Sequence, residues 1–116
     1  MTVREAVLEH VAAFNAHDRE RILTGLAPDV TWSTGRDTLH GQAALTELFD
    51  DGMWALTPHL HVVRLVVQGD RAAAEVVETL TVDGVEHVFT IACFFDLRGS
   101  VIHRVTVLRE GTADLP

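Results

Sequence analysis

The chain has 116 residues, a formal net charge of −8 at pH 7 and 47% hydrophobic residues. That length fits one domain, which we expect to span residues 1–116 with an ordered core at about 3–110. The lone Cys93 excludes a disulfide within the chain, the absence of Lys excludes Schiff-base chemistry, and the acidic balance disfavours nucleic acid and anionic membranes as partners.

The first half of the sequence predicts three helices and one short strand. Apolar residues recur at helical spacing over residues 3–15, and Asp18 stands where the cap of a second short helix over residues 19–26 belongs. Residues 29–34 alternate as a strand. Residues 41–56 then predict a third helix with one apolar stripe.

The second half changes to the two-residue period of β-strands. Four runs rich in β-branched residues are separated by turn-forming residue pairs, and they cover residues 60–67, 71–82, 87–95 and 101–109. Three helices followed by a four-strand antiparallel meander predict an α+β fold with the helices on one face of the sheet. A strongly curved sheet of this kind leaves a pocket on its concave side.

Neither end of the chain adds a targeting or core element. No basic segment followed by an apolar stretch precedes the first helix, and no apolar run approaches the ~20 residues of a membrane span. We therefore expect a cytoplasmic protein. Residues 111–116 are expected to lie outside the core.

The order of the elements and four local phrases carry a family resemblance. The phrases are HVAAFNAHD, APDVTW, HGQAALTELF and FFDLRGSVIHRVTV. Over nearly the whole chain, the sequence resembles the nuclear-transport-factor-2-like superfamily, and within it the SnoaL-like polyketide cyclases and ketosteroid isomerases. The resemblance implies a cone-shaped α+β barrel, with three N-terminal helices packed on a curved antiparallel sheet. It also implies a homodimer formed through the outer sheet face.

The resemblance further locates the family's catalytic positions. The oxyanion-hole tyrosine of ketosteroid isomerases corresponds to His10, their base to Thr34 and their second oxyanion-hole group to Ile91. The acid/base aspartate of SnoaL-like cyclases corresponds to about Thr106. No carboxylate stands at any of these positions, so the resemblance implies the fold and pocket but not the isomerase mechanism.

Three residues are the candidate catalytic groups. His10 shares a helix face with apolar neighbours, and an imidazole there could exchange protons or remain a half-buried structural side chain. Aligning Gly99 with the family's turn places Arg104 on the pocket face, where it could stabilise negative charge on a ligand. Glu78 would orient it. Alternatively, Arg104 lies on the outer face and pairs with Glu75 or Glu78, because a one-residue slip exchanges the faces.

A second set of residues is expected to contact the substrate. Most are aromatic side chains at inward positions, which could equally be ordinary core. The set comprises Phe14, Trp32, Phe49, Trp54, His61, Phe89, Phe95, Thr106 and Leu108.

The sequence predicts neither a metal site nor a cofactor. His59 and His61 form an H-x-H pair on one strand, but no carboxylate follows before Asp70. Cys93 alternates with apolar residues and is expected to be inert core.

These observations favour a small cofactor-free enzyme or binder of a hydrophobic, carbonyl-bearing molecule of polyketide- or steroid-like type. Isomerisation, cyclisation or dehydration by proton transfer would be the chemistry, with His10 as the acid/base. The alternative is a ligand-binding or dimerisation module without turnover. Two polar groups converging in the pocket would favour the enzyme.

Overall fold

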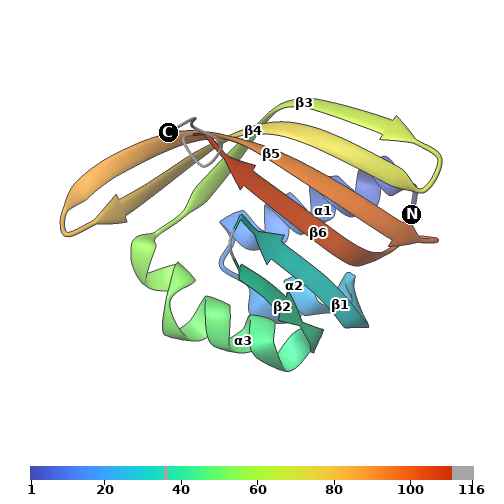
Figure 1. Ribbon diagram of the computed structural model, residues 1–116, viewed down its shortest axis with the longest axis horizontal. Helices are drawn as coiled ribbons and strands as arrows, with labels where there is room; N and C mark the ends of the chain where they lie inside the picture. Colours follow the sequence, from blue (N-terminus) through green and yellow to red (C-terminus); the bar gives the residue numbers. More distant parts are fainter. Residues whose placement is uncertain (36, 111–116) are drawn as a thin grey trace.

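The computed structural model describes residues 1–35 and 37–110, so the expected dispensable end at 111–116 lies outside the described residues. Figure 1 shows helices and strands in two layers. In chain order the elements are α1 Val3–Asn15, α2 Arg19–Thr24, β1 Leu26–Thr34, β2 Asp37–His40, α3 Gly41–Asp51, the 3-10 helix η1 Met53–Leu56, β3 His59–Gln68, β4 Arg71–Val82, β5 Val85–Arg98 and β6 Val101–Arg109.

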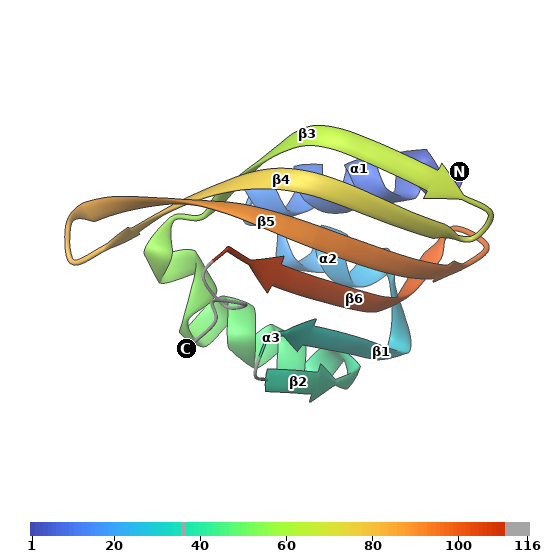
Figure 2. The ribbon, with the colours of Figure 1, turned by 45° about the horizontal axis from the view of Figure 1, so that its top comes forward.

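The strands form one sheet of six in the order β2-β1-β6-β5-β4-β3. The predicted antiparallel meander is confirmed as β3 to β6, and the predicted fold class, α+β with three N-terminal helices, is confirmed as well. The sheet is larger than predicted, because β1 joins β6 in parallel and the unpredicted β2 pairs with β1. Figure 2 shows the helices together behind this curved sheet.

The helices begin where local capping chemistry predicts. The Thr2 side chain accepts a hydrogen bond from the backbone N–H of Glu5, whose carboxylate accepts one from the backbone of Thr2, which completes a capping box at α1. Asp18 caps α2 by accepting from the N–H of Arg21. Helix α1 ends at Asn15, as predicted, but the predicted end of α2 at Leu26 is too late. Helix α2 ends at Thr24, because Leu26 already belongs to β1.

Helix α3 also ends earlier than predicted. Its regular hydrogen bonding stops at Asp51, and Gly52 leads into η1 with non-helical dihedral angles. Trp54 therefore lies on η1 rather than on the predicted stripe of α3. Glycine is the weakest helix former apart from proline, so the break falls where the backbone resists helix least.

The long β4–β5 hairpin depends on the turn residues that connect it. Asp83 and Gly84 both have positive φ angles, 50° and 77°, between paired Val82 and Val85. Two successive left-handed residues match the twist of a two-residue hairpin turn, and aspartate followed by glycine is a favoured pair there. The twelve register pairs of this hairpin fix the alternation of β4, including the inward position of Glu78.

Strand β6 contains one extra residue that changes which side chains face the helices. Arg104 pairs with Asp96 and Ile102 pairs with Leu97, so His103 has no partner on β5. Such a β-bulge shifts the alternation of the strand by one residue. Ile102 faces inward before the bulge, and Val105 and Val107 face inward after it.

The core lies between the inner face of the sheet and the helices. Helix α1 packs on β3, β4 and β6, and α3 packs on β1. The largest fully buried side chains include Phe49, Ile22 and Leu45, which come from α3 and α2. Within residues 1–35 and 37–110 there is no helix that is long and apolar enough to cross a membrane.

Candidate functional site

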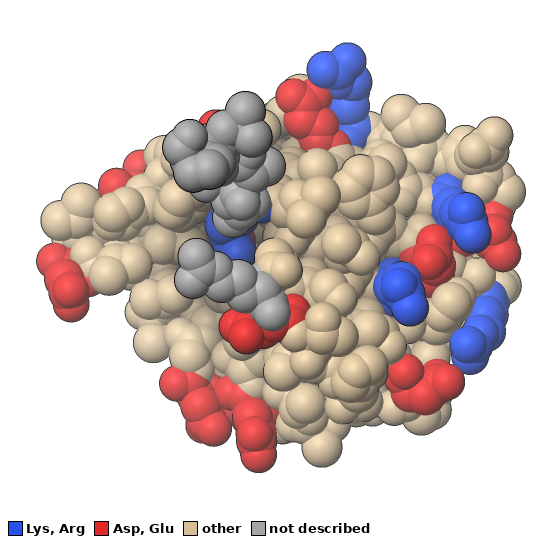
Figure 3. All heavy atoms as spheres, viewed as in Figure 1, with Lys and Arg blue, Asp and Glu red and all other residues tan. Residues whose placement is uncertain are grey.

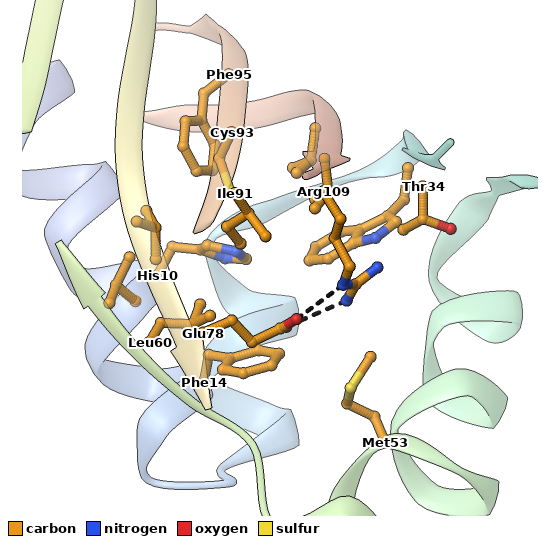
Figure 4. A pocket seen from close by; sticks show the side chains of 15 residues that line it. His10, Phe14, Thr34, Met53, Leu60, Glu78, Ile91, Cys93, Phe95 and Arg109 are labelled. Carbon is orange, nitrogen blue, oxygen red and sulfur yellow. Dashed lines mark hydrogen bonds and ion pairs between the residues drawn. The ribbon is translucent and has the colours of Figure 1, made fainter. Parts of the chain in front are cut away.

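An apolar pocket lies between α1, η1 and the inner face of the sheet (Figure 4). Its cavity volume is about 30 Å³, which is room for about two water molecules. The atom-free space of the pocket and its open mouth together is about 510 Å³. The lining residues are His10, Val11, Phe14, Trp32, Thr34, Met53, Leu60, Val76, Glu78, Ile91, Cys93, Phe95, Val105, Val107 and Arg109.

His10 projects from α1 into this pocket, as its position beside Val7 and Phe14 on the helix predicts. Its side chain is 6% exposed, and its ring meets Phe95 edge-on at 5.7 Å between centroids. Burial among apolar groups disfavours the charged imidazolium and lowers the pKa of His10 to about 4. At neutral pH the imidazole is therefore uncharged and can accept a proton. Its catalytic role stays a prediction.

Trp32 on β1 forms the wall opposite His10. The two rings are tilted, with centroids 5.6 Å apart, and the indole is 5% exposed. In the described part of the chain, His10 Nδ1 and Trp32 Nε1 are the buried side-chain nitrogen or oxygen atoms without a hydrogen-bond partner. Such an unsatisfied group costs about 1–3 kcal/mol of folding free energy. Because both atoms belong to residues that line one pocket, this pocket is the candidate site for a polar ligand atom.

Glu78 and Arg109 form a buried ion pair at the same pocket. Arg109 donates from Nε to Oε1 of Glu78 at 2.8 Å and from Nη2 to Oε2 at 3.1 Å. Glu78 is 2% exposed, whereas the Arg109 side chain is 27% exposed and reaches the mouth. Figure 4 shows the His10 ring directed toward this pair, with Met53 on the far side of the pocket. The guanidinium compensates the buried carboxylate charge.

Arg104, Thr106 and Leu108 do not face the pocket, and the prediction that they line it is wrong. Arg104 and Leu108 are exposed on the outer sheet face. The physical reason is the bulge at His103. Strict alternation from the inward Ile102 would turn these three residues inward, and the extra residue reverses the faces. The partner of Glu78 is consequently Arg109 and not Arg104.

The predicted substrate contacts divide into two groups. Phe14, Trp32 and Phe95 line the pocket. Phe49 and Trp54 lie outside it and stack on each other with ring centroids 5.0 Å apart. Phe49 supports the wall from behind through edge contacts with the rings of Phe14 and Trp32.

Two further predicted contacts also lie elsewhere. His61 is exposed on β3, which is the edge strand of the sheet. Phe89 is half-buried on β5 and stacks on His87. Neither residue lines the pocket, so the expectation that they contact the ligand there is wrong.

The comparisons with known proteins agree with this architecture. Residues 7–105 match the family described as the SnoaL-like domain. The chain belongs to this family. No curated protein matches the sequence.

Solved structures extend this SnoaL-like assignment. TerC, crystallised with polyporic acid, is 25% identical to this chain with a TM-score of 0.83, and the alignment covers 94% of this chain and 92% of TerC. A putative ketosteroid isomerase from Kribbella flavida is 22% identical, with a TM-score of 0.82 and coverages of 98% and 82%. A putative polyketide cyclase from Sinorhizobium meliloti is 16% identical, with a TM-score of 0.77 and coverages of 89% and 93%. The last two structures are less than 25% identical to this chain, so these similarities show the fold alone.

This SnoaL-like pocket contains residues that sequence reasoning did not assign to it. Among them, Arg109 carries a charge, and Met53 and Cys93 carry sulfur atoms. The signal for Arg109 was present, because His103, Val105 and Val107 form the more apolar face of β6 and Arg109 continues that face. Two positions located by the family resemblance, Thr34 and Ile91, do line the pocket.

The histidines and Cys93 are the remaining residues with ligand or nucleophile chemistry. No group of three or more His, Cys, Asp or Glu residues that could hold a metal occurs in the part of the chain that the structure describes. Cys93 lines the pocket, but burial and the nearby Glu78 raise the pKa of its thiol to about 12. At neutral pH the thiol is therefore protonated and a poor nucleophile.

Proposed function

We propose that this chain is a cofactor-free enzyme that moves a proton on a hydrophobic, carbonyl-bearing small molecule, of polyketide- or steroid-like type. The observation that carries the proposal is the uncharged His10 imidazole, with its unpartnered Nδ1, in an apolar pocket beside the Glu78–Arg109 pair. An isomerisation, cyclisation or dehydration would follow from the same proton transfer.

The proposed step is enolisation and return of the proton. His10 accepts a proton from the carbon next to the carbonyl, and the electrons of the C–H bond move into the enolate. The neighbouring guanidinium of Arg109, held in place by both oxygens of Glu78, favours the negative charge that develops on oxygen. Because burial disfavours the imidazolium, His10 returns the proton, and delivery to a different carbon isomerises the ligand.

The size of the pocket limits how a ligand would bind. A cavity of about 30 Å³ would admit a carbonyl group and its neighbouring carbon, but no ring system. The body of the ligand would lie in the mouth, near Thr34, Met53 and Arg109, and a multi-ring ligand would displace the Met53 side chain. The crystallisation of the similar TerC with polyporic acid supports an aromatic carbonyl compound as the ligand class.

The proposal is tested by hydrogen–deuterium exchange at the carbon next to the carbonyl. Acetophenone, 1-tetralone and a Δ5-3-ketosteroid are incubated in D2O with the wild-type protein, and exchange is followed by NMR. We expect exchange above the buffer rate for at least one ketone. His10→Phe should reduce it to the buffer rate, whereas His59→Phe, the same change at an exposed position, should not. Equal rates with wild-type protein and His10→Phe would contradict the proposal.

The second candidate function is a ligand-binding or dimerisation module without turnover. Two observations favour it. Both oxygens of Glu78, the carboxylate among the described lining residues, are engaged by Arg109 and are poorly placed to act as a base. The outer sheet face carries exposed apolar side chains such as Val66, Phe94 and Leu108. Figure 3 shows that most of the side in view is uncharged, with charged groups at its edges and in smaller clusters within it.

We propose that this outer face forms a homodimer. Phe94 is 47% exposed and lies on the central strand β5. Phe94→Glu should shift the sedimentation coefficient from that of a dimer to that of a monomer. Val85→Glu, at the tip of the β4–β5 hairpin, is the matched control and should leave the dimer intact. A monomeric wild-type protein would contradict this assembly.

A further inference from the structure

The two unpartnered nitrogen atoms of the pocket constrain what its ligand is. His10 and Trp32 are each more than nine-tenths buried, come from different elements and line the same pocket. An indole N–H can only donate a hydrogen bond, whereas a neutral imidazole nitrogen donates or accepts according to its tautomer. The pocket therefore requires an acceptor atom beside Trp32 Nε1.

The charge of the pocket points to an uncharged ligand. Glu78 and Arg109 are the charged side chains among the described lining residues, and two hydrogen bonds join them. Their charges sum to zero. An anionic ligand would have to compete with Glu78 for the Arg109 guanidinium, and a cationic ligand would have to compete with Arg109 for the Glu78 carboxylate.

We propose that Trp32 determines ligand specificity, its indole N–H donating a hydrogen bond to the carbonyl oxygen of an uncharged ligand while Nδ1 of His10 faces the adjoining carbon. The inference deepens the proposed function and rests on it for the identity of the site. Trp32 binds the oxygen on which negative charge develops, and its hydrogen bond strengthens as that charge grows.

Three probe molecules of similar shape separate the contribution of the carbonyl oxygen from the effect of a negative charge. Acetophenone carries the carbonyl, α-methylstyrene replaces its oxygen with a methylene group, and benzoate adds a negative charge. The indole N–H signals of Trp32 and Trp54 are followed by NMR in the wild-type protein, with Trp54→Phe to assign them. We expect acetophenone to move the Trp32 indole proton to higher frequency and α-methylstyrene not to do so.

Affinities of the variants give the second readout. Trp32→Phe should weaken binding of acetophenone by about 3- to 10-fold, the loss of one neutral hydrogen bond, and leave α-methylstyrene within about twofold. Trp54→Phe, a change of the same type outside the pocket, should affect neither probe. Benzoate should bind the wild-type protein at least about tenfold more weakly than acetophenone, because its carboxylate would have to compete with Glu78 for the Arg109 guanidinium.

Several results would overturn the inference. These are an identical indole shift with acetophenone and α-methylstyrene, an affinity ratio between those two probes that Trp32→Phe leaves unchanged, tighter binding of benzoate, or no binding of any probe up to its solubility limit. The wild-type NMR result does not depend on whether the Trp32 variant folds. Deuterium exchange that needs His10, together with an unchanged affinity ratio, would overturn this inference and leave the proposed function standing. A changed affinity ratio without deuterium exchange would overturn the proposed function and leave this inference standing.

Discussion

The carboxylate of Glu78 on β4 binds the guanidinium of Arg109 on β6 across the intervening strand β5. The pair is asymmetric, because the glutamate is buried and the arginine side chain reaches the pocket mouth. Substituting the glutamate and substituting the arginine should therefore have different costs in folding free energy. A buried ion without its partner is costly, whereas a partly exposed one can be hydrated.

We expect Arg109→Met to destabilise the fold more than Glu78→Met. The first variant leaves an uncompensated buried carboxylate and should cost about 3–5 kcal/mol, while the second leaves a hydrated guanidinium and should cost about 1–2 kcal/mol. The double variant Glu78→Met/Arg109→Met should lie within about 1 kcal/mol of wild type. Urea unfolding of the four proteins measures these free energies. Equal losses of unfolding free energy in the two single variants would show that Glu78 and Arg109 behave as a solvent-exposed ion pair.

The stability of the fold should fall between pH 6.5 and pH 4 because of His10. Its pKa is lowered from 6.5 to about 4 in the folded chain. Between these values the unfolded chain binds a proton that the folded chain does not, so acid favours unfolding. The loss should approach about 1.4 kcal/mol per pH unit and about 3 kcal/mol in total. Above pH 6.5 the residue should contribute no pH dependence.

The contribution of His10 is isolated by comparison with a variant that cannot titrate. The free energy of unfolding of wild-type protein is measured across this pH range against that of His10→Phe. Other groups titrate in both proteins, so the difference between them reports His10. A difference that stays constant from pH 7.5 to pH 4 would show that this imidazole is accessible to protons in the folded chain.

Asn15 should be required to hold the end of α1 on β3. Its side chain donates to the carbonyl oxygen of Leu60 and accepts from the N–H of Leu60, both at 2.8 Å. Asn15→Ala should cost about 1–3 kcal/mol, since it removes two hydrogen bonds from a half-buried site. Asn15→Asp keeps the acceptor but loses the donor, and should still destabilise measurably. Thermal unfolding compares the three proteins, and an unchanged Asn15→Asp would show that the donated bond contributes little.

Cys93 should be unreactive in the folded protein. The thiol is 5% exposed, and its pKa is raised to about 12 by burial and by the nearby Glu78. Labelling with iodoacetamide at pH 8 should be at least about 100-fold slower in buffer than in denaturant, where the pKa returns to about 8.5. Mass spectrometry measures the labelled fraction. Rapid labelling without denaturant would indicate that the pocket opens often.

The elements predictable from sequence were those whose signal is local. Asp18 caps α2 and Asp83-Gly84 turns the β4–β5 hairpin through interactions within a few residues. The parallel pairing of β1 with β6 joins segments about seventy residues apart, and neither strand records its partner in its own pattern. The four-residue strand β2 is too short for alternation to identify it.

The same difference between local signals and long-range pairing explains which residues of the candidate site could be predicted. The inward position of Glu78 follows from simple alternation along the regular strand β4. The inward position of Arg109 depends on the unpaired His103, and this bulge is seen in the pairing with β5. The Gly99 alignment assigned the wrong face, although the apolar character of Val105 and Val107 already indicated the right one.

The unpaired His103 has an evolutionary consequence. Deletion of that single codon would remove the bulge without exchanging the faces, because Arg104 would then follow Ile102 directly and stay outward while Val105, Val107 and Arg109 stay inward. If the strand kept every residue but paired without the bulge, Arg104 would turn inward and Arg109 outward, and Thr106 would replace Val107 among the inward residues. A gain or loss of one triplet can thus be absorbed by the bulge while the cavity keeps its chemistry, so relatives of this chain are better compared by strand phase than by residue identity.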